Sequence, residues 1–320
     1  MNKAKESYEY PLRLQPCEDR AKTLEWLSIV FLTITASLVY LVMGNSQAMK
    51  AALFEDLLAL IPPIAFLVVS RIRRRPQSHE YPYGFHRAVT VGFLISAFAL
   101  TSVGVFLLYD GASILIRQER TTIGTIDMFG FLVWQGWMMI AVMLLASIPL
   151  VFIGRAKKKP AAKIHDKLLH SDAEMNAADW KTGFATIVGI TGMGAGFWWA
   201  DAAAAVFISL NILYDGVRSL RDAVGDIMDR RPRTVDHLHD IGLVETMEDA
   251  LGKLKWVRAA KIRLRENGHV FFGEIAIEPI DEAEPLKRIE HAEKEVYALD
   301  WRIRHVAVTL VTADELNERL

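Results

Sequence analysis

The sequence has little cysteine and few recognisable motifs of covalent catalysis. Cys17 is its only cysteine, so no internal disulfide can form, and we give this thiol no role. The first 25 residues are polar and charged and lack the apolar stretch of a cleavable signal peptide. Neither a nucleotide-binding loop nor a supported Ser/His/Asp arrangement is visible. We therefore expect no enzyme, no ATP-driven pump and no prosthetic group.

The sequence also lacks a net charge that would identify a partner, because 37 basic and 38 acidic side chains leave only -1. It is rich in apolar residues, at 52%, which is typical of a membrane protein. Five windows approach the roughly 20 residues that a helix needs to cross a bilayer. These windows are 26–43, 51–69, 88–108, 128–153 and 182–214. The last is long enough for two crossings with a turn at its glycines (189–196), so we predict six transmembrane helices.

The predicted loops differ in their Lys and Arg content. Five arginines lie between spans two and three (71–87), and five basic residues lie between spans four and five (155–163). The other three loops hold at most two each. Because cytoplasmic loops are enriched in Lys and Arg, we expect both termini in the cytoplasm and the protein in the plasma (inner) membrane. We interpret the run at 155–163 as a loop facing lipid headgroups and expect no nucleic-acid partner.

The sequence turns charged after residue 214, and Pro232 ends the helical pattern. Beyond it we predict, in order, a helix (235–251), a strand (258–264), the turn Glu-Asn-Gly, a strand (270–277), a helix (284–299) and a strand (302–311). This αββαβ order fits a small ferredoxin-like α/β domain. The predicted fold class is an α-helical membrane protein with a small cytoplasmic α/β domain. Its parts are a cytoplasmic tail (1–25), six transmembrane helices (26–220), a linker (221–231) and the soluble domain (232–320).

Carboxylates interrupt two of the predicted spans, where an ionised group costs a few kcal/mol. Glu55 and Asp56 lie inside the second span, ahead of a kink predicted at Pro62 and Pro63. In the fifth, helical spacing places Asp172, Met175, Asn176 and Asp179 on one face and directs Glu174 elsewhere. Oxygen ligands from two helices suit a divalent cation, which would offset the burial cost.

Each of these residues also has a structural interpretation. Asp172 suits the start of a helix, where the macrodipole favours a carboxylate. Glu55 and Asp179 suit hydrogen-bonded contacts between helices. Asp56 suits an ion pair with a basic group on the opposite side, and Met175 suits packing.

Two further segments carry a family resemblance. The segment YPYGFHR (81–87) is close to the pattern H-P-Y-G-H-x-R/K, and the segment starting WADAAAAVF (199–207) is similar to a sixth helix that opens with Ala-Asp-Ala. Together with the six spans and the tail, they resemble the cation diffusion facilitator family over about residues 25–312. The resemblance implies a homodimeric exporter of divalent metal ions, usually exchanged for protons, that works by alternating access.

Counted from these motifs, the family's four ligand positions fall at Glu55, Ala59, Met175 and Asp179. Two carboxylates are kept, but a ligand on the second helix and a histidine on the fifth are replaced. Asp56, Asp172 and Asn176 could complete an oxygen-rich site. This would favour manganese or ferrous iron, with cobalt, nickel and zinc also open. The loss of the histidine also puts proton coupling in doubt.

The resemblance also implies a charge pair at the membrane surface of the dimer, here Arg87 and Asp229. The family's histidine-rich loop is replaced, and the soluble-domain histidines are interpreted as surface or core residues. We therefore expect that domain to hold the dimer together without sensing metal. The alternative function is a transport-inactive membrane scaffold or regulatory dimer whose metal site is eroded at Ala59 and Met175.

Overall fold

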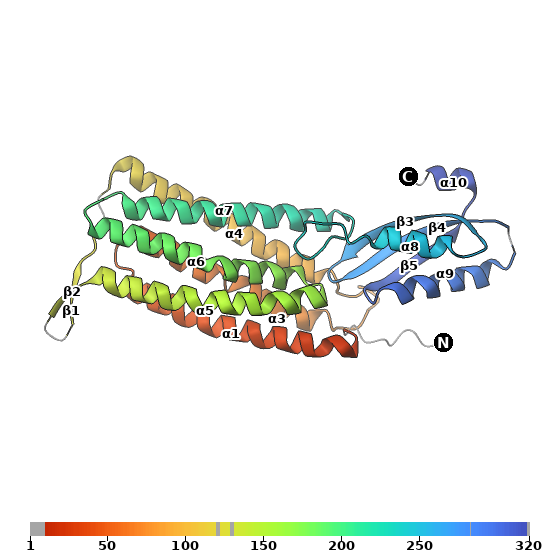
Figure 1. Cartoon of the computed structure of the whole chain (residues 1–320), viewed down its shortest axis with the longest axis horizontal. Coiled ribbons are helices and arrows are strands. Elements are labelled where there is room, and N and C mark those ends of the chain that lie inside the picture. The colour runs from red at the N-terminus through yellow and green to blue at the C-terminus, as the bar shows by residue number, and fades with distance from the viewer. Residues whose placement is uncertain (1–9, 120–121, 129–130, 282, 319–320) are drawn as a thin grey trace.

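The computed structural model describes residues 10–119, 122–128, 131–281 and 283–318. Long helices run side by side as a bundle, and a small α/β domain lies at one end of it (Figure 1). The bundle is built from α1 (Gln15–Val42), α2 (Gln47–Leu58), α3 (Ile61–Ile72), α4 (Ala88–Arg117), α5 (Gln135–Ile164), α6 (Lys167–Gly194) and α7 (Ala200–Ile227). α1 begins at the end that holds the α/β domain.

Five helical segments in the described part of the chain are long and apolar enough to cross a membrane. They are 12–42, 47–72 (α2 with α3), 88–117, 135–164 and 200–227. α6 lies alongside them with 28 residues, but polar and charged side chains interrupt its first half. Large apolar side chains such as Phe98, Phe152 and Phe184 are exposed on the outer faces of these helices, as expected for contact with lipid. The chain is a helical membrane protein.

The second predicted span contains a break close to where its prolines predict a kink. α2 ends at Leu58 and α3 begins at Ile61, with Pro62 and Pro63 in the first turn of α3. Proline is tolerated there because the first turn of a helix has no partner for its N–H groups. The break follows Glu55 by one turn.

Three predicted boundaries were wrong. The fourth window was predicted to start at residue 128, but β1 (Thr125–Met128) and β2 (Phe131–Trp134) pair as an antiparallel hairpin before α5 begins. The basic run 155–163 is not a loop, because α5 continues through it to Ile164. The turn predicted at residues 189–196 lies later, between α6 and α7, and Gly189 packs within α6 against α7.

The α/β domain has the predicted αββαβ order. β3 (Val257–Asn267) and β4 (Val270–Pro279) are antiparallel, β5 (Ile303–Leu310) is parallel to β4, and the sheet order is β3-β4-β5. α8 (Leu243–Gly252) and α9 (Pro285–Leu299) pack on one face around a core that includes Met247, Phe271 and Val296. The first helix starts at residue 243 rather than 235, and a short α10 (Ala313–Glu318) follows the last strand.

The β3–β4 turn inserts against the ends of the membrane helices. Gly268 adopts φ +71°, which favours glycine, and a Cβ there would lie 2.2 Å from the His86 carbonyl oxygen. The next residue, His269, is buried with its ring 5.0 Å from the Tyr10 ring and 5.6 Å from the His86 ring. Burial and the nearby Arg73 charge hold the pKa of His269 well below its usual range, so this imidazole is neutral.

A buried ionic network flanks the same turn. Lys167 Nζ, at the start of α6, lies 2.8 Å from Glu266 Oε2 of β3 and 2.9 Å from Asp226 Oδ2 of α7. His165 Nε2 lies 3.3 Å from the other Glu266 oxygen. All four side chains are buried, so the α/β domain is joined to the helices by desolvated polar contacts.

Candidate metal site and its approach

Glu55 of α2 and Asp179 of α6 come together inside the bundle. Thr182 Oγ1 donates a hydrogen bond to Glu55 Oε1 at 3.1 Å. Because Thr182 follows Asp179 by three residues, both side chains lie on one face of α6. The two carboxylates interact electrostatically as well. The structure therefore places near each other the two carboxylates that the family resemblance predicts as ligands.

Unsatisfied acceptors mark this part of the bundle. Asp179 Oδ2 is buried and accepts no hydrogen bond from the described residues. Asp56 is partly buried, interacts electrostatically with Glu55 and Asp179, and makes no hydrogen bond or ion pair within the described ranges. A buried oxygen without a donor costs free energy that a bound cation would recover. No group of three or more His, Cys, Asp or Glu side chains in the described part of the chain is arranged to hold a metal ion, so Glu55 and Asp179 would need other oxygen donors.

The two replaced ligand positions are apolar in the structure as well as in the sequence. Ala59 is buried at the end of α2 in a cluster with Leu32 and Leu150. Met175 packs against the same cluster. Since thioether and methyl groups do not replace a carboxylate or imidazole, the site is flanked by an apolar wall.

Asp172 and Asn176 belong to a second polar cluster, centred on Lys157 of α5. The Lys157 ammonium contacts the carboxylate of Asp172 and lies 2.8 Å from Glu25 Oε2 of α1. The Asn176 side chain donates to Asp172 Oδ2 at 3.3 Å. Asp172 thus faces a resident cation, and its role as a metal ligand stays a prediction, as does that of Asn176.

Two interpretations made from the sequence are corrected by this cluster. The basic run containing Lys157 was expected to face lipid headgroups, but Lys157 is buried within α5. Asp172 does not start a helix, because α6 begins at Lys167 and Asp166 caps it by accepting from Leu169 N at 3.0 Å. An acidic Glu25 at the edge of a predicted span was a signal for a buried partner, but its spacing from Lys157 gave no indication of contact.

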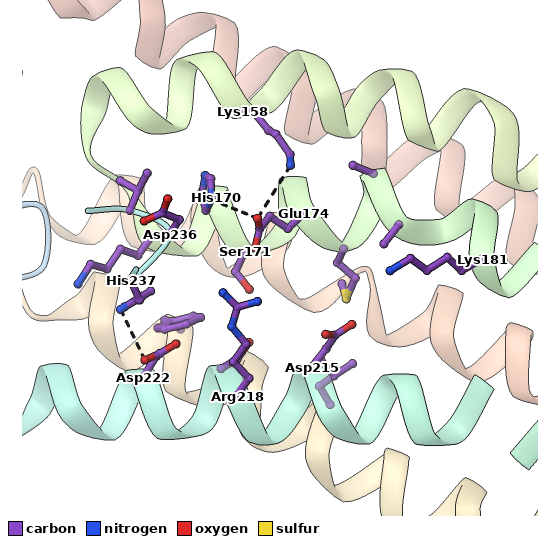
Figure 2. Close-up of a pocket in the computed structure, with 18 of the residues that line it drawn as sticks. Lys158, His170, Ser171, Glu174, Lys181, Asp215, Arg218, Asp222, Asp236 and His237 are labelled. Carbon is purple, nitrogen blue, oxygen red and sulfur yellow. Dashed lines mark ion pairs between the residues drawn. The ribbon is translucent and has the colours of Figure 1, made fainter. Parts of the chain in front are cut away.

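A cavity of about 330 Å³ lies beside the first half of α6 (Figure 2). It lies between α4, α6, α7 and residues 235–237, and titratable groups dominate its lining. Asp215 of α7 lines the cavity and interacts electrostatically with Glu55. The labelled lining side chains are Lys158, His170, Ser171, Glu174, Lys181, Asp215, Arg218, Asp222, Asp236 and His237.

The cavity contains both paired and neutral groups. Glu174, interpreted as pointing away from the candidate ligands, lies 3.6 Å from His170 and 3.9 Å from Lys158. Burial, followed by the charges of Lys167 and Arg230, lowers the pKa of His237 to about 2. His237 therefore lines the cavity as a neutral imidazole.

The predicted surface pair also meets within the chain. Arg87 donates to Asp229 Oδ1 at 2.7 Å, and Arg265 of β3 donates to Asp229 Oδ2 at 2.8 Å. All three side chains are at least 40% exposed, so these contacts are worth less than about 1 kcal/mol each. Asp229 therefore joins the start of α4 to the soluble domain.

A helical membrane bundle that contains buried carboxylates and a cavity lined by titratable side chains is typical of an integral membrane transporter. The sequence profile of the cation efflux transmembrane domain matches residues 25–228, more than half of the chain. The chain therefore belongs to the cation diffusion facilitator family of metal cation efflux transporters, which are not enzymes.

Several relatives are similar along most of the chain. The Manganese efflux system protein MneS of Bacillus subtilis (strain 168) is 24% identical, covering 85% of this chain and 91% of that protein. The Uncharacterized transporter YdbO of the same strain is 22% identical, with 86% and 88% covered. The Cation-efflux pump FieF of Yersinia pestis (strain Pestoides F) is 24% identical, with 78% and 79% covered.

Proposed function

We propose that this protein exports a divalent transition-metal ion from the cytoplasm, with Glu55 and Asp179 as its main ligands and Asp56 as a third. The observation that supports this most is that Glu55 and Asp179 lie near each other while the buried Oδ2 of Asp179 has no hydrogen-bond donor among the described residues. A cation would satisfy that oxygen and neutralise the paired carboxylates.

We further propose that α6 crosses the membrane with the five apolar segments, giving six crossings and placing both termini in the cytoplasm. The polar residues of α6 that lower its apolarity include Asp172 and Asn176, which are buried inside the bundle rather than exposed to lipid. The cavity then opens toward the cytoplasm, as in an inward-facing state. Rocking of the helices would expose the site to the other side, with protons as the coupling ions.

Manganese or ferrous iron is the proposed substrate, ahead of cobalt, nickel and zinc. The candidate ligands are carboxylate oxygens, which prefer harder ions, and the Met175 position offers no imidazole nitrogen. The similarity to a manganese efflux protein supports testing manganese first.

We also propose that the α/β domain is ferredoxin-like and that it holds two copies together as a homodimer. Its αββαβ order and its one-sided helical layer support the fold assignment. Dimer mass measured by light scattering in detergent, with and without chelator, tests whether assembly needs metal.

The test of transport is ion flux into proteoliposomes. We expect the wild type to move manganese or iron, Asp179→Asn and Glu55→Gln to lose at least about tenfold of that flux, and Glu174→Gln to keep it. A tenfold loss corresponds to about 1.4 kcal/mol. Zinc flux without manganese or iron flux would refute the metal assignment. Equal flux in the Asp179 variant would refute the site, and no flux of any ion would favour the scaffold function.

A further inference from the structure

A groove of about 390 Å³ lies between α1 and α3 and is separate from the candidate metal site. Its lining consists of Lys22, Trp26, Ile29, Ile64, Leu67, Val68, Ser70, Arg71 and Arg74. On α1 the spacing of Lys22, Trp26 and Ile29 places them along one helix face. Ile64, Val68 and Arg71 share a face of α3 in the same way.

The groove is cationic at one end and apolar at the other. α1 starts at the soluble-domain end of the bundle, and α3 runs toward that end, as Figure 1 shows. Lys22 near the start of α1 therefore lies at the same level as Arg71 near the end of α3. Ile29 and Ile64 lie further into the apolar part of the bundle, and the exposed Trp26 lies between the two zones. Tryptophan at such a position is typical of the membrane–water boundary.

Charge at the cationic end is only partly neutralised. Glu18 pairs with Lys22 at 2.8 Å and with Arg74 at 3.0 Å, and it also holds the buried Arg73. Asp19 lies 3.9 Å from Lys22. Arg71 is exposed and makes no ion pair with any residue that the structure describes. The three cations that line the groove are Lys22, Arg71 and Arg74. Glu18 and Asp19 pair with the other two, and Arg71 is left for a ligand.

We propose that this groove binds an anionic phospholipid from the leaflet nearer the soluble domain. Its phosphate would lie at Arg71 and Lys22, and an acyl chain would lie along Ile29, Ile64 and Val68. A lipid phosphate would supply the anionic partner that Arg71 lacks among the described residues. The apolar half of the groove matches a hydrocarbon chain rather than a free anion. The proposal concerns lipid and does not depend on which metal is transported.

The test uses delipidated full-length protein in detergent, titrated with phosphatidylglycerol or with phosphatidylcholine of the same acyl chains. Native mass spectrometry counts bound lipid. We expect wild type to bind phosphatidylglycerol preferentially and Arg71→Gln to weaken this binding about fivefold, the contribution of one cation near a membrane surface. Arg71→Lys should keep most of the affinity. Arg155→Gln is the matched control, because Arg155 is an exposed arginine of α5 outside the groove.

Three results would overturn the proposal. Equal binding of the two lipids would show that charge does not select the occupant. Equal weakening by the Arg155 and Arg71 variants would show a general surface effect. Displacement of phosphatidylglycerol by an equal concentration of inorganic phosphate would identify a free-anion site. We expect the Asp179 variant to lose metal flux but to bind phosphatidylglycerol like the wild type. The lipid test and the transport test can therefore fail independently.

Discussion

Replacing Glu266 by Gln tests how firmly the soluble domain is docked on the membrane helices. The substitution keeps the side-chain shape but removes a buried charge that faces Lys167 and His165. Lys167 keeps Asp226 at 2.9 Å, so no ammonium group is left without a partner. We therefore expect a loss of about 1.5–3 kcal/mol, typical of a contact to a charged group, rather than the 3–5 kcal/mol of an orphaned buried charge.

Limited proteolysis of the segment between α7 and α8 measures this docking. If opening is fast relative to cleavage, the expected loss raises the cleavage rate roughly 10- to 150-fold. Glu274→Gln is the control, because Glu274 is an exposed carboxylate on β4 of the same sheet. Equal cleavage rates for the Glu266 and Glu274 variants would refute the reasoning.

The same variant predicts a pH dependence. Burial raises the pKa of Glu266, but His165 and the Lys167 charge outweigh this, so the folded pKa lies below the ordinary value of 4.5. A lowered carboxyl pKa gives stability that is present above about 4.5 and lost as pH falls through the folded value. Wild-type cleavage should therefore accelerate toward acid pH, and Glu266→Gln should flatten this change. Parallel pH curves for the two proteins would contradict the assignment.

Three further predictions concern the bundle and the dimer. Gly154→Val should destabilise the protein by about 1–3 kcal/mol, because a Cβ at this position would lie 2.5 Å from Ala177 N on α6. Thermal unfolding measures the loss, and Gly252→Ala is the control because a Cβ at Gly252 would meet open space. Asp201→Ala should lower the free energy of unfolding by about 1–2 kcal/mol, because this buried carboxylate on α7 accepts hydrogen bonds from Gln47 N and Ala48 N at the start of α2. Thermal unfolding measures this loss. Arg87→Asp should weaken the dimer in light scattering, and adding Asp229→Arg should restore it only in part, because Arg265 then faces an arginine. Unchanged dimer mass in the single variant would count against a role for this pair.

The helices could be predicted from the sequence because membrane-spanning helices are apolar over a fixed length. The break between α2 and α3 was also predictable, since Pro62 and Pro63 remove backbone donors. The strands of the first hairpin were not, because a short apolar run such as Phe-Leu-Val-Trp (131–134) fits a strand and a helix equally well. The segment 235–242 was wrongly predicted to be helical. α8 begins only at Leu243, after Gly242 with its left-handed φ of +69°.

The candidate site was predictable only in part. Spacing from two motifs predicted Glu55 and Asp179 as ligands, and that role stays a prediction. The structure places Thr182, one helical turn from Asp179, in hydrogen-bond contact with Glu55. Helical spacing alone grouped Asp172 with Asp179, yet their partners differ. Lys157 contacts the carboxylate of Asp172 and makes no hydrogen bond to Asp179. Contacts between residues more than a hundred positions apart depend on helix packing, which a single sequence does not reveal.

The buried contact between Lys157 and Glu25 can form only after most of the membrane helices have been synthesised. The two residues are 132 positions apart, so α1 is made long before its partner cation exists. At about 5–20 residues per second, this delay is on the order of ten seconds. During that time Glu25, which precedes the boundary residue Trp26, has no lysine partner on α5. The contact that ties α1 to α5 through Lys157 is therefore one of the later contacts of the bundle to form, although α1 is the first of its helices to be made.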